Sequence, residues 1–315
     1  MPQHSSLARL QQVITLGLLA AAIASLSWNW KSSPGWAIGG FLLIALGYAI
    51  ILAIEFFLLR WLSGSSGALR PTVAQLARAW LGETLVAPRI FCWRQPFRWR
   101  AVPDQLEPLA GAGPRRGVVL IHGFVCNRGF WTPWLERLRA AGHPFIAVNL
   151  EPIFGSIEDY APLIEDAVER ITRATGMPPV LVCHSMGGLA ARAWLAARPG
   201  ADRVHRVVTI GSPHRGTWLG RFSRTANGRE MRLDGDWIRG LLPRLDASVN
   251  ARFICWYSNC DNIVFPVETA TLPGADNRLL PGVAHVQLAF HPEVMRATLA
   301  LIAEHERNFS QQLSS

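Results

Sequence analysis

Five short apolar runs alternate with segments of helical periodicity in the second part of this chain of 315 residues. Runs rich in Val, Ile and Leu that are separated by helices are typical of a parallel sheet covered on both faces. The pattern therefore predicts an α/β fold, in which chemistry collects at the carboxyl ends of the strands. The predicted strands are GVVLI (117–121), PFIAVNL (144–150), PVLVC (179–183), RVVTIGS (206–212) and RFICWYS (252–258).

Two long apolar stretches precede this region. From Trp36 to Ile54 the chain carries no charge. As a helix, this stretch is long enough to cross a hydrocarbon core of about 30 Å. The stretch from Val13 to Trp28 reaches that length with its flanks, and the NWKSSPG between the two is turn-like. Residues 1–62 therefore predict a two-helix transmembrane hairpin. A cleaved signal peptide would also fit the first stretch, because Ala22 and Ala24 form an A-x-A pattern.

The distribution of basic residues predicts the orientation of this hairpin. The turn between the two apolar stretches has only Lys31, whereas several arginines follow the second stretch. Because basic residues are retained on the inner side of a membrane, we expect an integral protein of a bacterial-type inner membrane with its large C-terminal part in the cytoplasm. Tryptophans near the stretch ends fit the interfaces. The arginines are Arg60, Arg70, Arg78, Arg89 and Arg94, and the tryptophans are Trp28, Trp30, Trp36 and Trp61.

The remaining chain divides into a connector and a catalytic domain. Residues 63–115 begin with SGSSG and end in a Gly- and Pro-rich segment, so we expect a juxtamembrane connector with early strands. Within it, RIFCWRQPFRWR (89–100) fits either a pair of such strands or a surface that faces anionic lipid headgroups. The domain at 116–315 carries an insertion at about 215–250 that is polar with scattered Trp and Leu, as is typical of a lid.

Charge and cysteine content exclude several classes of function. The net charge is +9, but the arginines are scattered and no nucleic-acid-binding motif is present, so no nucleic-acid partner is expected. The five cysteines are an odd number without C-x-x-C spacing, which predicts neither a disulfide framework nor a zinc site. No metal, no organic cofactor and no protein partner are inferred.

Ser185 is the candidate nucleophile. It follows the predicted strand 179–183 directly and precedes a predicted helix, which places it at the carboxyl edge of the sheet. A serine hydroxyl becomes a nucleophile only when a base takes its proton and N–H donors stabilise the resulting oxyanion. The sequence must therefore also supply a base, an acid that orients the base, and two donors.

The segment CHSMGG around Ser185 resembles the nucleophile elbow G-x-S-x-G of the α/β-hydrolases, particularly their lipase-like branch. Cys183 stands where the family has the first glycine. The IHGF that ends at Phe124 resembles the family's oxyanion loop. The resemblance implies an α/β-hydrolase fold, with the backbone N–H groups of Phe124 and Met186 as the oxyanion donors.

The acid and the base are assigned by the same resemblance. CWYSNCDNIVFP places Asp261 after a strand, as in the family's acid loop, and His285 follows a short run and a glycine turn, as the family's catalytic histidine does. The family's order along the chain is serine, acid, histidine. His122 precedes the serine and is therefore expected to be structural, as is the His214 of TIGSPHRGT. His291, beside a proline at a helix start, is expected to cap that helix or to lie at the surface.

The implied activity is that of a carboxylic ester hydrolase, a lipase or esterase, with the triad Ser185, Asp261 and His285. The membrane hairpin predicts an apolar ester or lipid substrate and the lipid bilayer as the partner. A thioesterase, an acyltransferase or a phospholipase would use the same triad. A non-catalytic, membrane-tethered binding protein on the hydrolase fold is the alternative outside enzymology.

Overall fold

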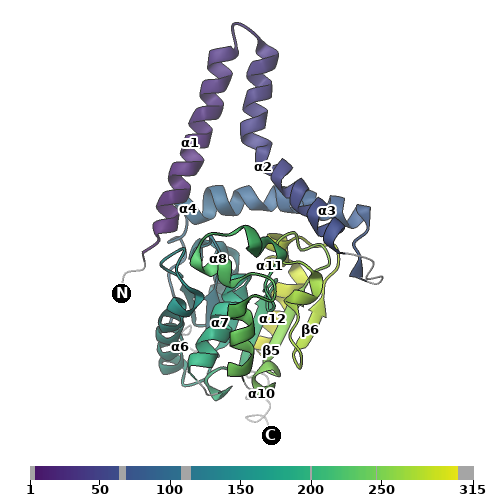
Figure 1. Cartoon of the computed structure of the whole chain (residues 1–315). Helices are drawn as coiled ribbons and strands as arrows, with labels where there is room; N and C mark the ends of the chain where they lie inside the picture. Colours follow the sequence, from purple (N-terminus) through teal and green to yellow (C-terminus); the bar gives the residue numbers. More distant parts are fainter. Residues whose placement is uncertain (1–3, 64–68, 108–114, 199–200, 246, 304–315) are drawn as a thin grey trace.

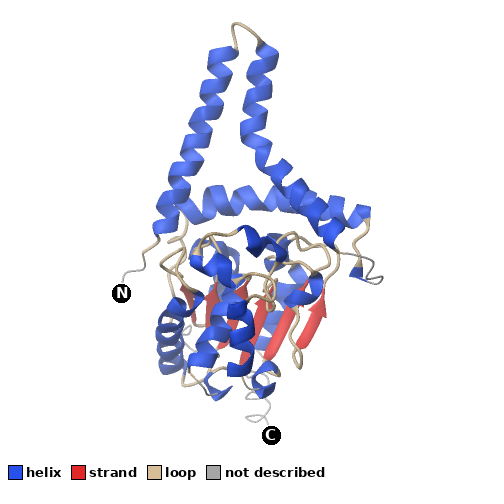
Figure 2. Ribbon diagram, viewed as in Figure 1, coloured by secondary structure: helices blue, strands red, loops and turns tan. Residues whose placement is uncertain are grey.

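The computed structural model describes residues 4–63, 69–107, 115–198, 201–245 and 247–303. Its centre is a six-stranded, fully parallel sheet in the order β2-β1-β3-β4-β5-β6 (Figure 2). The five predicted strands are confirmed, and a sixth strand forms the edge beyond β5. The strands are β1 (Val118–Ile121), β2 (Phe145–Val148), β3 (Val180–His184), β4 (Arg206–Ile210), β5 (Phe253–Tyr257) and β6 (Asp276–Leu279).

Alternate residues of β1 to β5 face two separate hydrophobic cores, whereas β6 is exposed. Val119 and Ile121 of β1 pack with α6 (Ala161–Thr175) and α7 (Met186–Ala197) on one face. Val118 and Leu120 pack with helices on the other face, namely α5 (Thr132–Ala140) and α12 (Pro292–Ile302). This is the covered parallel sheet that the apolar runs predict.

The strand order creates a switch point at the centre of the sheet. The chain goes from β1 outward to β2 and then crosses back to β3 on the other side of β1. Loops that leave β1 and β3 therefore diverge to opposite faces, and such a crevice is where open α/β sheets place their chemistry. The loop 122–127 follows β1 and Ser185 follows β3, so both lie there.

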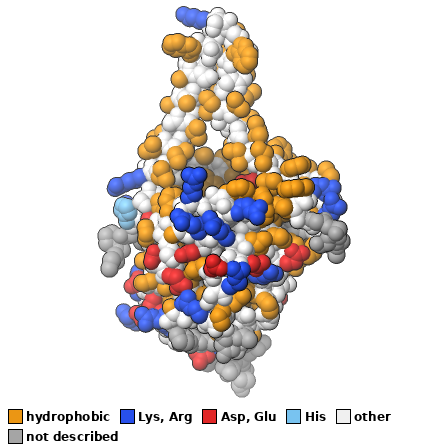
Figure 3. Space-filling model, viewed as in Figure 1, with side chains coloured by type: hydrophobic (Ala, Val, Ile, Leu, Met, Phe, Trp, Pro, Cys, Tyr) orange, Lys and Arg blue, Asp and Glu red, His pale blue; other side chains and the backbone are white. Residues whose placement is uncertain are grey.

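Two long helices, α1 (Ser6–Asn29) and α2 (Pro34–Leu62), rise from the carboxyl edge of the sheet as a hairpin (Figure 1). Both are long and apolar enough to cross a membrane, and only 11% of each most apolar window is buried. This exposure distinguishes them from the core helices of a soluble domain. In Figure 3 hydrophobic side chains cover the hairpin, and Lys and Arg side chains gather on the visible face just below it.

The expected connector is mainly helical. Its ends lie partly outside the described residues, but α3 (Val73–Pro88), a π-helical turn (Arg89–Arg94) and α4 (Gln95–Phe97) form one continuous helical segment across the carboxyl edge of the sheet (Figure 1). The expectation of early strands is corrected: the described part of 63–115 forms no strand and only an isolated bridge from Gln105 to Phe145. One face of the segment packs on the domain, and this apolar contact favours the helix.

Both ends of the hairpin contact the domain that contains the sheet. At the start of α1, the backbone N–H and the hydroxyl of Ser6 donate to the carboxylate of Glu151, at 2.8 and 2.7 Å. At the end of α2, a third hydrophobic cluster joins α2 and α3 to the loops after β5 and before α11 (His285–Ala289). We call it the junction cluster; it consists of Phe56, Leu59, Leu76, Ala79, Cys260, Phe265 and Ala284.

The insertion at 215–250 folds into short helices that extend from the carboxyl edge of the sheet, where α8 (Ala226–Glu230) lies, to the opposite edge, where α10 (Ala247–Asn250) leads into β5 (Figure 1). Its N-terminal part lies on the acid loop, since the Trp218 ring stacks on the Phe265 ring at a centroid distance of 6.0 Å and the backbone N–H of Trp218 donates to the Phe265 carbonyl at 2.9 Å. Further along, Glu230 accepts from the hydroxyl of Ser156 at 2.7 Å. The described helical elements are a 3₁₀ turn (Trp218–Phe222), α8 (Ala226–Glu230), α9 (Asp236–Leu241), a 3₁₀ turn (Leu242–Arg244) and α10 (Ala247–Asn250).

Candidate active site

Ser185 occupies a strained turn between β3 and α7. Its φ and ψ are 53° and −128°, in a region that side-chain-bearing residues rarely adopt. The turn is held from both sides: the Ser185 N–H donates to the Ile210 carbonyl of β4 at 3.0 Å, and Gly187 lies where a Cβ would meet the Ile121 carbonyl oxygen at 2.4 Å. The sharp bend therefore needs a very small residue at 187 and presents the serine at the sheet edge.

Cys183 stands in β3 at the position where the elbow usually has a small residue. Its side chain is fully buried in the core on the α6–α7 face. Burial raises the pKa of the Cys183 thiol, because the thiolate would have no solvent around it. The cysteine therefore packs as a small hydrophobic residue two positions before the serine.

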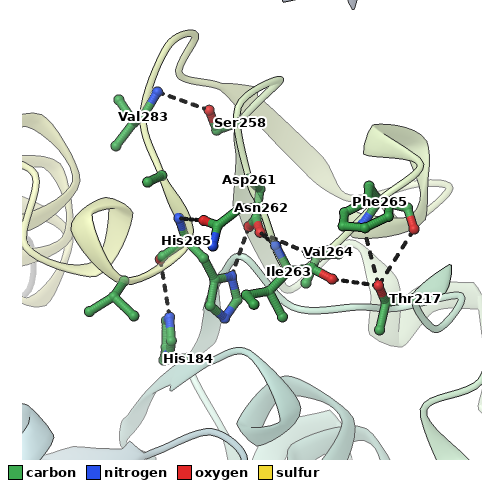
Figure 4. Close-up of polar contacts among 12 residues, drawn as sticks. His184, Thr217, Ser258, Asp261, Asn262, Ile263, Val264, Phe265, Val283 and His285 are labelled. Atoms are coloured by element: carbon green, nitrogen blue, oxygen red, sulfur yellow. Dashed lines mark hydrogen bonds and ion pairs between the residues drawn. The ribbon is translucent and has the colours of Figure 1, made fainter. Parts of the chain in front are cut away.

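Asp261 and His285 form a buried pair at the same edge. The Asp261 Oδ2 lies 2.9 Å from the His285 Nδ1, and both side chains are almost inaccessible to solvent (Figure 4). The second oxygen, Oδ1, accepts from the backbone N–H groups of Ile263 and Val264 at 3.0 and 2.8 Å. These two backbone hydrogen bonds fix the orientation of the carboxylate that contacts the imidazole. Burial alone would lower the pKa of His285, but the carboxylates of Asp261, Glu83 and Glu55 together outweigh this effect and the pKa is raised.

Ser185 lies beside this pair. A Cβ on Gly211, the residue after Ile210, would lie 2.9 Å from the Asp261 Oδ2 and 3.1 Å from the His285 Nδ1. Since the Ile210 carbonyl binds the Ser185 N–H, the serine backbone and the pair share one small region. In the part of the chain that the structure describes, no hydrogen bond joins the Ser185 hydroxyl to the His285 ring.

The predicted oxyanion donors flank the serine. Phe124 lies in the loop after β1 and Met186 begins α7. Within the described ranges neither backbone N–H donates to another protein group. Val125, next to Phe124, has a φ of 52°, which is an outlier for a β-branched residue. Such strain concentrates at functional sites, where the surrounding structure holds it.

Two side chains that the sequence did not single out support the His285 segment. The His184 ring lies between the rings of Phe130 and His285, at centroid distances of 4.5 and 4.6 Å. Its Nε2 is 3.3 Å from the His285 carbonyl oxygen (Figure 4). Asn262 accepts from the His285 N–H at 3.2 Å. His184 directly precedes Ser185 in the sequence, and Asn262 directly follows Asp261. Their contacts with His285, however, join positions that are 101 and 23 residues apart, respectively.

His122, His214 and His291 make structural contacts. His122 accepts from the Leu150 N–H at 3.0 Å through Nε2 and contacts the Gly123 carbonyl through Nδ1, and burial lowers its pKa to about 4. His214 is buried against the Thr209 hydroxyl at 3.0 Å. His291 caps α12, as predicted, since its Nδ1 accepts from the Glu293 N–H at 3.3 Å.

No cluster of three or more His, Cys, Asp and Glu side chains that could hold a metal ion occurs among the described residues. All five cysteines are unpaired, and only Cys92 is exposed.

A model of the alpha/beta hydrolase family matches residues 118–306. Lipase BlEst2 of Bacillus licheniformis in its mature form is a similar solved structure, with a TM-score of 0.55 and 15% identity over 62% of this chain and 95% of that lipase. Lipase B of Aspergillus fumigatus has a TM-score of 0.51 and 18% identity, over 63% of this chain and 55% of that chain. These likenesses describe the fold. Because the family match spans more than half of the sequence and contains the whole sheet, the chain belongs to the α/β-hydrolase family.

Proposed function

We propose that this α/β-hydrolase is a membrane-anchored serine hydrolase that cleaves carboxylic esters of apolar acyl groups, as a lipase or esterase. The observation that carries the proposal is the 2.9 Å contact between the His285 Nδ1 and the Asp261 Oδ2 at the edge where Ser185 is strained. An imidazole held by a carboxylate at Nδ1 has its Nε2 available as a base.

In the proposed reaction, the His285 Nε2 takes the proton of the Ser185 hydroxyl as Oγ attacks the ester carbonyl carbon. The ester C–O bond then breaks, and the alcohol leaves with the proton that His285 holds. Water repeats the sequence on the acyl-enzyme: it gives a proton to His285, attacks the acyl carbon, and releases the acid while Oγ regains its proton. The hydrogen bond between serine and histidine often tightens only when substrate is bound.

The N–H groups of Phe124 and Met186 are proposed to bind the oxyanion of both tetrahedral intermediates. Their support is that both lie beside Ser185 and that neither N–H has a protein acceptor within the described residues. Removal of one such donor costs about 10²–10³ in rate in other enzymes.

The proposed apolar substrate and the bilayer follow from the surface around the site. The helical segment α3–α4 exposes apolar side chains four or eight positions apart, on the side away from the domain core. A helix with such a stripe lies well in a membrane interface. The start of α3 packs against the end of α2. The hairpin could therefore span a bilayer while the apolar stripe lies in the interface of the same bilayer. Its members are Val73, Leu81, Leu85, Trp93 and Phe97.

We propose further that the catalytic domain lies on the cytoplasmic side of an inner membrane. The support is the excess of arginines after α2 over the single Lys31 in the hairpin turn.

Labelling of the full-length protein with a fluorophosphonate, together with hydrolysis of p-nitrophenyl esters of several chain lengths, tests the proposal. Wild type should react, Ser185→Ala should lose both signals, and Ser32→Ala, a change in the exposed hairpin turn, should keep them. Absence of any Ser185-dependent label or hydrolysis would leave a non-catalytic binding role on the hydrolase fold. Thioester, phospholipid and alcohol-acceptor assays then separate the thioesterase, phospholipase and acyltransferase alternatives.

A further inference from the structure

Three carboxylates from three separate elements converge on the segment that carries His285. Asp261 comes from the loop after β5, within the family match. The other two are Glu83 of α3 and Glu55 of α2, and both belong to the N-terminal part of the chain that the family match leaves out. The N-terminal helices α2 and α3 therefore contribute side chains to the surroundings of the His285 imidazole.

Glu83 binds the backbone directly after His285. Its Oε1 accepts from the Val286 N–H at 2.9 Å and its Oε2 from the Gln287 N–H at 3.0 Å, and the side chain is only 2% exposed. The neighbouring Gly82 lets α3 approach this closely, since a Cβ there would lie 2.6 Å from the Gln287 side chain. A buried carboxylate with both oxygens engaged sets the direction in which α11 begins.

Glu55 reaches the same segment through Asn262. Its Oε2 accepts from the Asn262 Nδ2 at 2.7 Å, and the Asn262 Oδ1 accepts from the His285 N–H at 3.2 Å. Asn262 is fully buried and follows Asp261 directly. The last turns of α2 are thus joined by two hydrogen bonds to the backbone of His285 and to the loop that holds its acid partner.

The two contacts fix consecutive backbone groups. The N–H of His285 is held through Asn262, and the next two N–H groups are held by Glu83. With the carbonyl of His285 near the His184 ring, little freedom is left to the Cα from which the imidazole extends. Both carboxylates also add to the effect of Asp261 in raising the pKa of His285 against the lowering effect of burial.

Resting on the proposed function, we infer that Glu83 and Glu55 are positioning residues of the triad, through which α3 and the hairpin helix α2 hold the imidazole of His285 in place for Ser185. A cap that only stabilised α11 would leave turnover and its pH dependence unchanged once the protein is folded. A positioning role changes kcat more than KM, because it acts on proton transfer and not on substrate binding.

The test uses the full-length protein in lipid vesicles, with the Gln variants as near-isosteric changes. Glu83→Gln should lower kcat by about tenfold or more with KM within about twofold, since a small displacement of a catalytic group is costly. It should also move the acid limb of the kcat/KM profile to lower pH. Glu55→Ala should lose more activity than Glu55→Gln, whose amide oxygen can still accept from Asn262. Glu136→Gln, an exposed charge removal on α5, is the matched control and should match wild type.

Amide hydrogen exchange supplies a readout that does not depend on activity. The segment 284–288 should exchange about tenfold faster in Glu83→Gln than in wild type, because exchange follows local opening and the variant loses one acceptor. The segment 294–302 of α12 should not change.

These readouts separate the two hypotheses. If the fluorophosphonate does not label the wild type, the proposed function is overturned. Amide exchange would still report whether Glu83 holds the backbone that follows His285. A labelled wild type with Glu83→Gln and Glu55→Ala variants that keep its kcat, pH profile and exchange overturns the positioning role. If Glu83→Gln does not fold, the comparison of Glu55→Ala with Glu55→Gln decides in the same way.

Discussion

Gly123 lies directly against the nucleophile, so that a Cβ on the glycine would stand 2.7 Å from the Cβ of Ser185 and 3.2 Å from the carbonyl oxygen of His184. The loop that carries the Phe124 N–H and the turn that carries the serine are therefore in van der Waals contact. A methyl group at residue 123 must push them apart.

We predict that Gly123→Ala lowers kcat by about 10²–10³, the usual effect of losing one oxyanion donor. The reason is that the displaced loop can no longer bring the Phe124 N–H to the oxyanion. Gly240→Ala is the control, because a Cβ at this position in α9 has open space around it. Ester hydrolysis and thermal unfolding of both variants check the prediction, which a folded and fully active Gly123→Ala would contradict.

Replacement of the acid should separate orientation from packing. Asp261→Asn keeps the shape of the side chain but presents an amide to the imidazole, so we expect kcat to fall by about 10⁴, as for other triads. Asp276→Asn is the comparison, since Asp276 is an exposed partner of Arg278 at 2.6 Å and should be near neutral. Steady-state kinetics provide the measurement, and equal activity of the two variants would remove Asp261 from the triad.

The activity should rise with pH through the ionisation of His285. Only the neutral imidazole accepts the serine proton, and the folded pKa of His285 is raised above 6.5 because Asp261, Glu83 and Glu55 outweigh the effect of burial. The acid limb of kcat/KM should therefore have its midpoint above pH 6.5. A pH profile with a substrate that does not ionise measures it, and a midpoint below 6.5 would count against His285 as the base.

The burial of Glu83 should make the protein less stable as the pH rises. Desolvation raises the pKa of Glu83 from 4.5 to about 7, although its backbone donors and His285 oppose this and Asp261 adds to it. A raised folded pKa means that its stabilising contribution is complete below pH 4.5 and is lost as the pH rises through about 7. The shift corresponds to about 3 kcal/mol at most. The midpoint of thermal unfolding should therefore depend less on pH between 5 and 8 in Glu83→Gln than in wild type.

The sidedness of the catalytic domain can be measured with an introduced thiol. The Asp236 side chain is fully exposed, and Cys92 is the exposed cysteine to be removed. In a Cys92→Ser, Asp236→Cys variant we expect a membrane-impermeant maleimide to react only after the cells are permeabilised, since the arginines after α2 favour the cytoplasm. The Cys92→Ser protein alone should stay unlabelled, and labelling of intact cells would reverse the proposed orientation.

The sheet and the positions at its carboxyl edge were predictable from sequence because they depend on local signals. Val- and Ile-rich runs marked the strands, and small residues after β3 marked the turn at Ser185. The catalytic roles of Ser185, Asp261 and His285 remain predictions, but Asp261 and His285 are in contact in the structure. Residues 89–100 were left between two interpretations, because aromatic and basic residues suit a pair of strands as well as a surface that faces anionic lipid headgroups.

The contacts of Glu83 and Glu55 could not be read from local patterns. Each joins positions more than 200 residues apart, and no periodicity relates such positions. Glu55 had one local signal, since it is the acidic residue that ends the uncharged stretch of the second apolar segment. An acid in such a segment is costly, and a functional partner is the default explanation.

The junction cluster has a practical consequence. A fragment that starts at residue 116, the usual way to obtain a soluble enzyme, would lack Phe56, Leu59, Leu76 and Ala79 and would leave Cys260, Phe265 and Ala284 bare to water. The loops that carry Asp261 and His285 would lose the apolar helices α2 and α3 that cover them. Biochemistry on this protein therefore has to begin with the intact polypeptide.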